Sequence, residues 1–489
     1  MSNLELQQAL KYIVKAQDKF SKWTREVVLG DKYYDNADQI MIHGAAAIDA
    51  VNGYLQTIGQ NPLRSADNRI SNNWHEILTV QKNAYLFTYP PVFTIGGDEE
   101  LSQRINEMLG DDYAKTISRL GTYATNAGTS WLQYWINADG EFKIVAMKAD
   151  QCAAFTDPMD IDETIVALVR EYTLQDENGD DVPHYEVWDK DEVIFVNGTT
   201  MKQEFVVMGG EMVDRMKNPF GKVPFIEFSN NERKSSDLKK YKGLIDAYDK
   251  VVSGFINDLD DIQEIILVLK DLNGETESVV YVPDRDEDGN IKYDEDGEII
   301  TKEIQKPVNL LQQIKAQKYL TVDDTGGVDK LTVDIPTEAR DVALTLLQKQ
   351  IFISGMGVDP NPERTGQATG AYVDHLYHLL ELKAGLMETE FRSSLNKLVR
   401  AMLDYIGAGK DKKITQSWTR NKPKDANETV NRLNATPENV MSNYTKRRLH
   451  PDIDDPDLED KLVKKEQQEN LQNMVDSFGQ PQEEQENGV

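Results

Sequence analysis

An unbroken apolar stripe between residues 238 and 266 constrains the fold more than any other feature of the sequence. Its members recur every three or four residues, the spacing that places side chains on one face of an α-helix. They are Leu238, Tyr241, Leu244, Ile245, Tyr248, Val251, Val252, Phe255, Ile256, Leu259, Ile262 and Ile266. The spacing predicts a helix over 235–270, roughly 50 Å long, with Ser235 and Ser236 as N-caps. Such a length favours packing against another helix.

Other parts of the chain share this helical spacing. Pro336 suits the first turn of a helix, and the stripe that follows predicts a helix over 336–354. After a loop over 355–370 that contains Gly and Pro, a long helix is predicted over 371–407. Further helical segments are predicted at 1–55, with a break near 33–36, from 70 to 85, and at 99–125.

Between residues 130 and 230 the hydrophobic period changes from helical to alternating. Residues 130–136 and 141–147 flank an Asn-Ala-Asp-Gly turn and predict a β-hairpin. Further strands are predicted at 165–174, 184–188, 193–196 and 204–207, and residues 220–228 close the region. The predicted fold class is therefore α+β, mainly helical, with 1–230 as one α+β unit.

Composition excludes several kinds of protein. The 489 residues include 54 basic and 84 acidic side chains, which gives a net charge of −30. This charge argues against a general nucleic-acid binder and against a surface that grips anionic membranes. Cys152 is the only cysteine, so a disulfide framework and a four-cysteine metal site are excluded, and we expect a buried thiol.

The first residues lack a signal-peptide pattern, and no apolar run approaches the ~20 residues that a membrane-spanning helix needs. We therefore expect a reducing cytoplasm or a soluble particle, without membrane contact.

An acidic segment follows the stripe helix. Between 258 and 303 there are 16 acidic and 4 basic side chains, and two octets, 286–293 and 294–301, repeat one pattern. The segment also satisfies a calcium-loop pattern, with Asp284, Asp286, Asp288 and Glu295 as ligands. The flanks 279–283 and 299–304 are strand-like rather than helical, so we favour a solvated hairpin with Asp-Gly turns. A divalent-cation site is the alternative, and no other cofactor is expected.

No arrangement typical of an enzyme is present. His375 and His378 lie one turn apart, but a metal would need further ligands, so helix packing or solvation is the preferred interpretation. Residues 411–460 predict short helices joined by turns near 434–441 and 450–456. A short helix at 309–319 and a strand near 331–335 are also predicted, and 464–489 is expected to be a disordered acidic tail.

The order of these parts is informative. An α+β unit precedes a long helix, an acidic insert, a second helix, a Gly/Pro loop, another long helix and an acidic tail. With the stretches 68–78, 218–248 and 318–382, this order resembles the portal proteins of tailed bacteriophages, in the long-tailed group. The resemblance covers about residues 25–450.

The resemblance implies a dodecameric ring at one capsid vertex, through which double-stranded DNA is packaged and ejected without specific binding. It implies docking of the terminase large subunit and then of a head-completion adaptor, besides contacts with major capsid and scaffolding proteins. The protein would belong to the virion, and to the host cytoplasm during assembly. No hydrolysis is implied, because the ATP-driven motor would be a separate protein.

Mapped on this chain, the resemblance assigns the wing to 1–230, stem helices to 231–264 and 336–354, and the clip to 265–335. The tunnel loop would be 355–370, the long wing helix 371–407, the crown 408–463 and the tail 464–489. The implied tunnel-loop residues are Gly357, Asn361, Glu363, Arg364, Thr365 and Gln367. The implied docking residues of the clip are Asp284, Asp286, Asp288, Asp294 and Asp296.

An acidic wall repels phosphates and lets a duplex slide, which agrees with this role. Arg364 would then make transient phosphate contacts, although a solvated charge or an intersubunit ion pair fits equally well. The alternatives to a portal protein are a calcium-binding module, an enzyme whose site the sequence does not reveal, and another structural component of a phage head.

Overall fold

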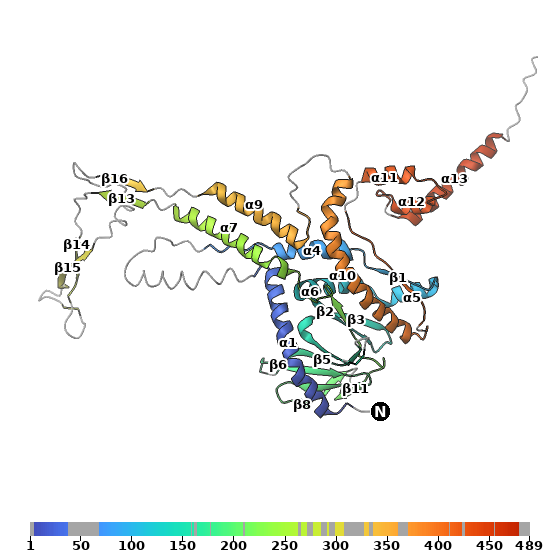
Figure 1. Ribbon diagram of the computed structural model, residues 1–489, viewed down its shortest axis with the longest axis horizontal. Helices are drawn as coiled ribbons and strands as arrows, with labels where there is room; N and C mark the ends of the chain where they lie inside the picture. Colours follow the sequence, from blue (N-terminus) through green and yellow to red (C-terminus); the bar gives the residue numbers. More distant parts are fainter. Residues whose placement is uncertain are drawn as a thin grey trace, which may run out of the picture. The chain divides into compact units, whose positions relative to one another are not determined.

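The computed structural model of the chain (Figure 1) describes most of the sequence. It describes residues 4–37, 68–157, 159–160, 164–176, 178–208, 211–262, 266–270, 277–284, 291–292, 299–307, 327–331, 336–359, 370–409, 411–422, 426–453 and 455–478. The chain divides into two compact units. The first comprises Met1–Met41, Ser71–Tyr248 and Thr345–Val489, and the second comprises Ile42–Ile70 and Asp249–Leu344.

Helices and strands both contribute to the described residues. The helices are α1 (Leu6–Tyr34), α4 (Trp74–Phe87), α5 (Glu99–Met108), α6 (Tyr113–Ala127), α7 (Lys242–Ile262), α9 (Thr337–Gly355), α10 (Gly370–Tyr405), α11 (Ala426–Ala435), α12 (Asn443–Leu449) and α13 (Pro456–Phe478), with 3₁₀ turns η1 (Ala149–Gln151) and η2 (Leu238–Lys240). The strands are β1 (Val92–Ile95), β2 (Thr129–Ile136), β3 (Phe142–Lys148), β4 (Cys152–Thr156), β5 (Ile165–Gln175), β6 (Asp181–Trp188), β7 (Glu192–Asn197), β8 (Lys202–Gln203), β9 (Val206–Met208), β10 (Glu211–Val213), β11 (Arg215–Lys217), β12 (Phe225–Ser229), β13 (Ile266–Lys270), β14 (Glu277–Pro283), β15 (Thr301–Pro307), β16 (Gly327–Leu331) and β17 (Ile414–Ser417). This mixture confirms the predicted α+β class.

A three-stranded antiparallel sheet in the order β12-β2-β3 lies in the largest apolar core of the first unit. The predicted hairpin is confirmed: β2 and β3 pair in register, with Trp131 opposite Met147. β2 is the middle strand, and it is buried on both faces over its first six residues. α10 packs on β12, where the rings of Phe391 and Phe228 meet edge to face.

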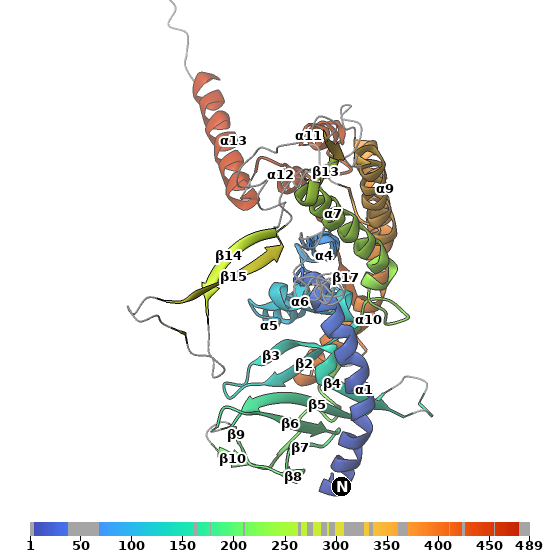
Figure 2. The same cartoon turned by 90° about the vertical axis from the view of Figure 1, so that its left-hand side faces the viewer.

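A larger antiparallel sheet follows the order β11-β7-β6-β5-β4, with β8 paired to β7. α1 lies along this sheet (Figure 2) and buries Ala9, Ile13, Ala16 and Phe20, which share one helical face, against Val169 and its strand neighbours. A separate cluster joins this sheet to the smaller one through side chains such as Trp131 and Trp188. The helix ends at Tyr34, which agrees with the predicted break near 33–36.

A two-stranded sheet of β1 and β17 was not predicted, because region 411–460 was expected to be mostly helical. Both outer edges of this sheet are occupied by helix side chains. On the β1 side, the Asn106 amide accepts from the Phe93 N–H at 3.1 Å and donates to its carbonyl at 2.9 Å. On the β17 side, Arg392 of α10 donates to the Gln416 carbonyl at 3.4 Å. Helix side chains thus occupy main-chain groups at the middle of both edges of this sheet.

The predicted helix over 235–270 is shorter in the structure, which corrects both of its ends. The Ser236 hydroxyl accepts from the Leu238 N–H of turn η2, whose N-cap is Asp237, and α7 begins only at Lys242, so neither predicted serine caps it. Beyond Ile262 the chain turns to strand, since β13 pairs antiparallel with β16. The apolar run of β13 suits a strand as well as a helix, and its pairing partner decides the outcome.

The helix predicted over 336–354 is confirmed as α9, and the Pro336 carbonyl accepts the first-turn N–H of Arg340. Within the second unit, Arg340 pairs with Asp258 of α7 and lies over the Phe255 ring, so the two helices contact each other. α10 confirms the long helix predicted at 371–407. The helix predicted at 309–319 lies outside the described residues.

Two further expectations change in the structure. The region 99–125 is two helices, because Gly110 adopts a φ of 74° between α5 and α6. The expected disordered tail is helical up to Phe478, in α13. Its Lys and Glu residues have high helix propensity, and Lys464 pairs with Asp460 one turn away. Within the described part of the chain, no helix is both long enough and apolar enough to span a bilayer.

Candidate functional site

The structure describes only some of the residues predicted for function. Of the tunnel-loop residues it describes Gly357; Asn361, Glu363, Arg364, Thr365 and Gln367 lie outside the described residues. Of the acidic clip residues it describes Asp284; Asp286, Asp288, Asp294, Glu295 and Asp296 lie outside them. The geometry of the site can therefore be followed at the base of the predicted loop, where α9 ends.

The residues that follow α9 are pressed against α4. A Cβ on Gly355 would lie 2.5 Å from Leu78 Cδ1, and a Cβ on Gly357 would overlap the other methyl group of the same side chain. Met356 between them adopts a φ of 50°. At Gly357, which the resemblance assigns to the tunnel loop, the lack of a side chain permits close contact with α4.

A single side chain of α4, that of Gln81, binds both main-chain groups of Val358, the residue after Gly357. The Gln81 Oε1 accepts from the Val358 N–H at 3.0 Å, and the Gln81 Nε2 donates to the Val358 carbonyl at 2.8 Å. This pairing copies the way a neighbouring strand would bind an extended residue. The start of the predicted loop is thus held by hydrogen bonds as well as by apolar contact.

A buried charge cluster lies at the same helix end. Lys383 of α10 donates to the Gly355 carbonyl at 2.8 Å and pairs with Asp237 at 3.1 Å. Lys82 of α4 pairs with the same Asp237 oxygen at 2.7 Å and donates to Asn230 at 2.6 Å. A cation at a helix C-terminus is favourable, because the terminal carbonyls carry partial negative charge.

Burial and charge together set the protonation of this cluster. Burial lowers the pKa of Lys82 to about 8 and lowers that of Lys383, while Asp237 opposes both shifts. Burial alone would raise the pKa of Asp237, but the surrounding lysines hold it well below its ordinary value. At neutral pH all three groups are charged, so one carboxylate serves two buried ammonium groups.

A second buried chain of hydrogen bonds begins at His75, on the same helix. Asn126 donates through its Nδ2 to Asp31 at 3.1 Å, so its Oδ1 faces the His75 Nε2, also at 3.1 Å. Nε2 therefore carries the proton, and Nδ1 accepts from the Tyr241 hydroxyl at 2.7 Å. Burial lowers the pKa of His75 to about 4, so the ring is neutral at pH 7.

The acidic segment contains a β-hairpin formed by β14 and β15. β14 and β15 pair from Glu277 opposite Pro307 to Pro283 opposite Thr301, which confirms the predicted strands. Directly after β14, the Asp284 carboxylate pairs with Lys292 at 2.9 Å and with Lys302 at 3.6 Å. A calcium ion at Asp284 would have to displace these lysines. In the described residues, no group of three or more His, Cys, Asp or Glu side chains is placed to hold a metal.

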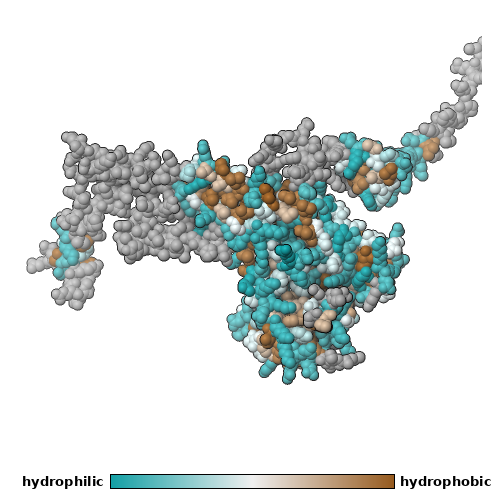
Figure 3. Space-filling model, in the orientation of Figure 1, coloured by the Kyte–Doolittle hydropathy of each residue, from teal (hydrophilic) through white to brown (hydrophobic). Residues whose placement is uncertain are grey.

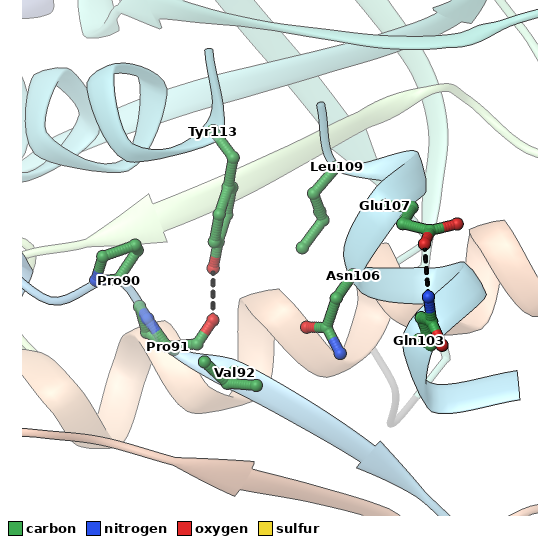
Figure 4. A pocket seen from close by; sticks show the side chains of 8 residues that line it. All are labelled: Pro90, Pro91, Val92, Gln103, Asn106, Glu107, Leu109 and Tyr113. Atoms are coloured by element: carbon green, nitrogen blue, oxygen red, sulfur yellow. Dashed lines mark hydrogen bonds between the residues drawn. The ribbon is translucent and has the colours of Figure 1, made fainter. Parts of the chain in front are cut away.

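An open pocket of about 500 Å³ lies elsewhere in the first unit (Figure 4). Its walls are mainly apolar and include Pro90, Pro91 and Leu109. Its polar groups are already used, because Tyr113 donates to the Pro91 carbonyl at 3.4 Å and Gln103 donates to Glu107 at 2.8 Å. This pocket is therefore an apolar hollow whose Tyr113 and Gln103 side chains already have hydrogen-bond partners, and it does not have the character of a catalytic site.

Sequence reasoning did not identify Gln81, Lys82, Asp237 or Lys383. A signal was present for two of them. Lys82 falls four residues after Leu78 and four before Leu86, so a charge occupies the apolar stripe of its helix. Lys383 interrupts the stripe of α10 in the same way. Charged side chains at such positions are buried only when they are paired.

Comparison with known proteins identifies the family. The family model described as "Phage portal protein, SPP1 Gp6-like" matches residues 19–473. The portal protein of Clostridium phage phiCD119 is 33% identical over 475 residues, which cover 93% of this chain and 95% of that one. The chain belongs to the phage portal protein family. The predicted family, and with it a portal function at the head-to-tail connector, is thereby confirmed.

The chain is also similar, at lower identity, to one further portal protein and to two solved structures. The portal protein of Bacillus phage SPP1 is 26% identical over 451 residues, covering 87% of this chain and 82% of that one. Among solved structures, a chain from the neck of an empty GTA particle, computed with C6 symmetry, has a TM-score of 0.38 and 13% identity and covers 78% of this chain and 90% of its own. A chain from the neck of a native GTA particle, computed with C12 symmetry, has a TM-score of 0.33 and 11% identity and covers 82% and 99%. Scores this low carry no argument about assembly.

Proposed function

We propose that twelve copies of this chain form a ring at one capsid vertex, through which double-stranded DNA is packaged and later ejected. The observation that carries the ring is an uncovered apolar stripe on α10, in which Leu379, Leu382 and Leu386 are 37%, 50% and 54% exposed. On α9, Leu346 and Ile353 are also exposed, and Figure 3 shows hydrophobic side chains at the surface of that helix.

A stripe of this kind costs free energy in water. Burying a leucine fully stabilises by about 1.5–3 kcal/mol relative to exposure, and contiguous apolar patches mark interfaces. A second copy of the chain is the occupant that the portal family favours. Closed rings use one heterologous contact repeated around an axis, so the same stripe would be covered in every subunit.

The charge of the chain supports the passage of DNA. Each copy carries −30, and a ring repeats this charge around its axis. A wall of carboxylates repels phosphates, whereas lysine and arginine contacts would retain the duplex through counterion release. In this proposal the ring is a passive conduit without enzymatic activity, and a separate ATP-driven motor moves the DNA.

The parts of the chain would then divide the work. Residues 355–370, with Arg364 among them, would face the channel, and 408–463 would face the capsid interior. The acidic segment within 265–335 would dock the terminase large subunit during packaging and the head-completion adaptor afterwards. Deleting 284–300 should leave the ring intact and weaken capture of either partner in a pull-down. Unchanged capture would remove the docking role.

Electron microscopy with native mass measurement tests the ring. The wild-type protein should give rings with a central hole and a mass of twelve chains. Leu386→Asp places a charge on the stripe and should leave a folded monomer. Val207→Asp is the matched control, since Val207 is 69% exposed on β9, away from α10, and should still form rings. Rings from both variants would show that the stripe does not carry assembly.

A further inference from the structure

The buried cluster at the end of α9 has a feature that simple packing does not require. Lys383 has two acceptors of different kinds, a carboxylate and a main-chain carbonyl at a helix end. Lys82, equally buried on the same carboxylate, has no bond to that helix end. The difference between the two lysines points to a role for Lys383 that involves α9.

We propose that Lys383 and Gln81 form a two-point latch that reversibly holds residues 355–358 against α4 and α10. Lys383 fastens the last carbonyl of α9, and Gln81 fastens both main-chain groups of Val358. The latch controls whether the segment after α9 is docked or released. It rests on contacts within one chain and is independent of the ring.

Asp237 allows the latch to open without leaving a buried cation unpaired. An ammonium group left without a partner in the interior is strongly destabilising. When the Gly355 carbonyl moves away, Lys383 keeps Asp237 at 3.1 Å and so remains paired. Lys82 and Asn230 hold this carboxylate in place, since Asn230 donates to its other oxygen at 2.9 Å. The released state therefore contains no orphaned charge.

The docked state depends on close fit. Gly355 and Gly357 contact Leu78 so closely that a methyl group at either position would overlap it. The amide of Gln81 is half-buried, so water can replace its bonds to Val358 when the segment leaves. Gly355 is buried on the core side chain Leu78, whereas Gly357 and Val358 are only half-buried, so the proposed release begins at Val358.

Amide hydrogen exchange of the full-length assembled protein tests the latch. In wild type, the Val358 amide, which donates to Gln81, should exchange faster than the Tyr134 amide in the middle strand β2. Gln81→Met removes the paired amide and should raise exchange at Val358 by about fivefold or more, the equivalent of one net hydrogen bond. Val80→Ala on the neighbouring, exposed position is its control and should leave that exchange unchanged.

A second variant removes the other fastening point. Lys383→Met should raise exchange at the Val358 amide, while Asp237 keeps its pair with Lys82, so the fold survives. Ser394→Ala is the matched control, because Ser394 also bonds a main-chain carbonyl from α10, that of Glu227, far along the chain from Gly355. The proposal is overturned if Lys383→Met and Ser394→Ala give equal exchange at the Val358 amide. Wild-type protection at Val358 as strong as that in β2 would also overturn it, since the contact would then be static.

Discussion

Lowering the pH from 7 to 5 is expected to destabilise the fold through one buried histidine. Burial lowers the pKa of His75 to about 4; Asp237 opposes this shift and Lys383 reinforces it. In the unfolded chain a histidine titrates near ~6.5. The folded state therefore resists a proton that the unfolded state accepts, and protonation pulls the chain toward unfolding.

The sign and size follow from these two values. Because the folded-state pKa is the lower one, the stabilising contribution is complete above pH 6.5 and disappears as the pH falls toward 4. Between pH 7 and pH 5, linkage gives a loss of about 2 kcal/mol in the free energy of unfolding. That is a large share of the ~5–15 kcal/mol that a typical folded protein possesses.

Urea unfolding followed by tryptophan fluorescence at several pH values measures this loss. The matched variant is His75→Gln, whose amide can donate to Asn126 and accept from Tyr241 without titrating. The measurement uses the Leu386→Asp background, which is expected to be monomeric, so that subunit dissociation does not contribute to the measured stability. From pH 7 to pH 5, the protein with His75 should lose about 2 kcal/mol more free energy of unfolding than the His75→Gln variant.

Two results would refute this reasoning. A stability difference that stays constant over that pH range would show that His75 titrates alike in both states. An NMR titration of the native protein that places the histidine near its ordinary pKa would show that the ring is hydrated. Either result would also remove the deduced neutral tautomer.

Further outcomes follow from single positions. Gly357→Ala should destabilise by about 1–3 kcal/mol in thermal unfolding, because the added Cβ overlaps Leu78. Gly254→Ala, where a Cβ meets nothing, should stabilise by about 0.5–1 kcal/mol, and equal effects of the two substitutions would contradict the close contact of Gly357 with Leu78. The Cys152 thiol is buried and burial raises its pKa, so a thiol reagent should label it only after unfolding, and complete labelling of native protein would disprove its burial. Arg364→Glu should still assemble into rings yet reduce DNA packaging, and normally filled heads would remove its proposed channel role.

Local pattern was sufficient where the interactions that stabilise an element are close in sequence. The hairpin of β2 and β3 has alternating residues and a short Asp-Gly turn, and both features act within 20 residues. α9 and α10 carry apolar stripes that need no knowledge of a partner. The family resemblance added the order of parts, which no single segment contains.

Prediction failed where the partner lies far along the chain. β13 begins with an apolar run of four residues and pairs with β16 some 60 residues later, and its pattern alone fits a helix equally well. β1 and β17 are four residues each and meet from opposite ends of the sequence. In α13 the error had another cause, since polar composition was taken for disorder although Lys and Glu favour helix.

The candidate site shows the same limit. Gly357 was identified as part of the loop, but its contact with Leu78 is visible only once α4 and α9 are folded together. Lys82 and Lys383 are separated from Asp237 by more than a hundred residues, so nothing local reveals that one carboxylate serves both. Their positions within apolar stripes were the only available sign.

The occupied main-chain groups at the edges of the β1–β17 sheet affect how copies of the chain can assemble closely without aggregating. An unpaired strand is a template for any other extended segment, and polymerisation through such edges is a hazard for proteins held at high local concentration. Here the Asn106 amide of α5 binds the N–H and the carbonyl of Phe93, and Arg392 of α10 donates to the Gln416 carbonyl. A strand of a neighbouring subunit cannot pair with these groups while the helix side chains hold them, which disfavours growth of the sheet into a continuous ribbon from one copy to the next.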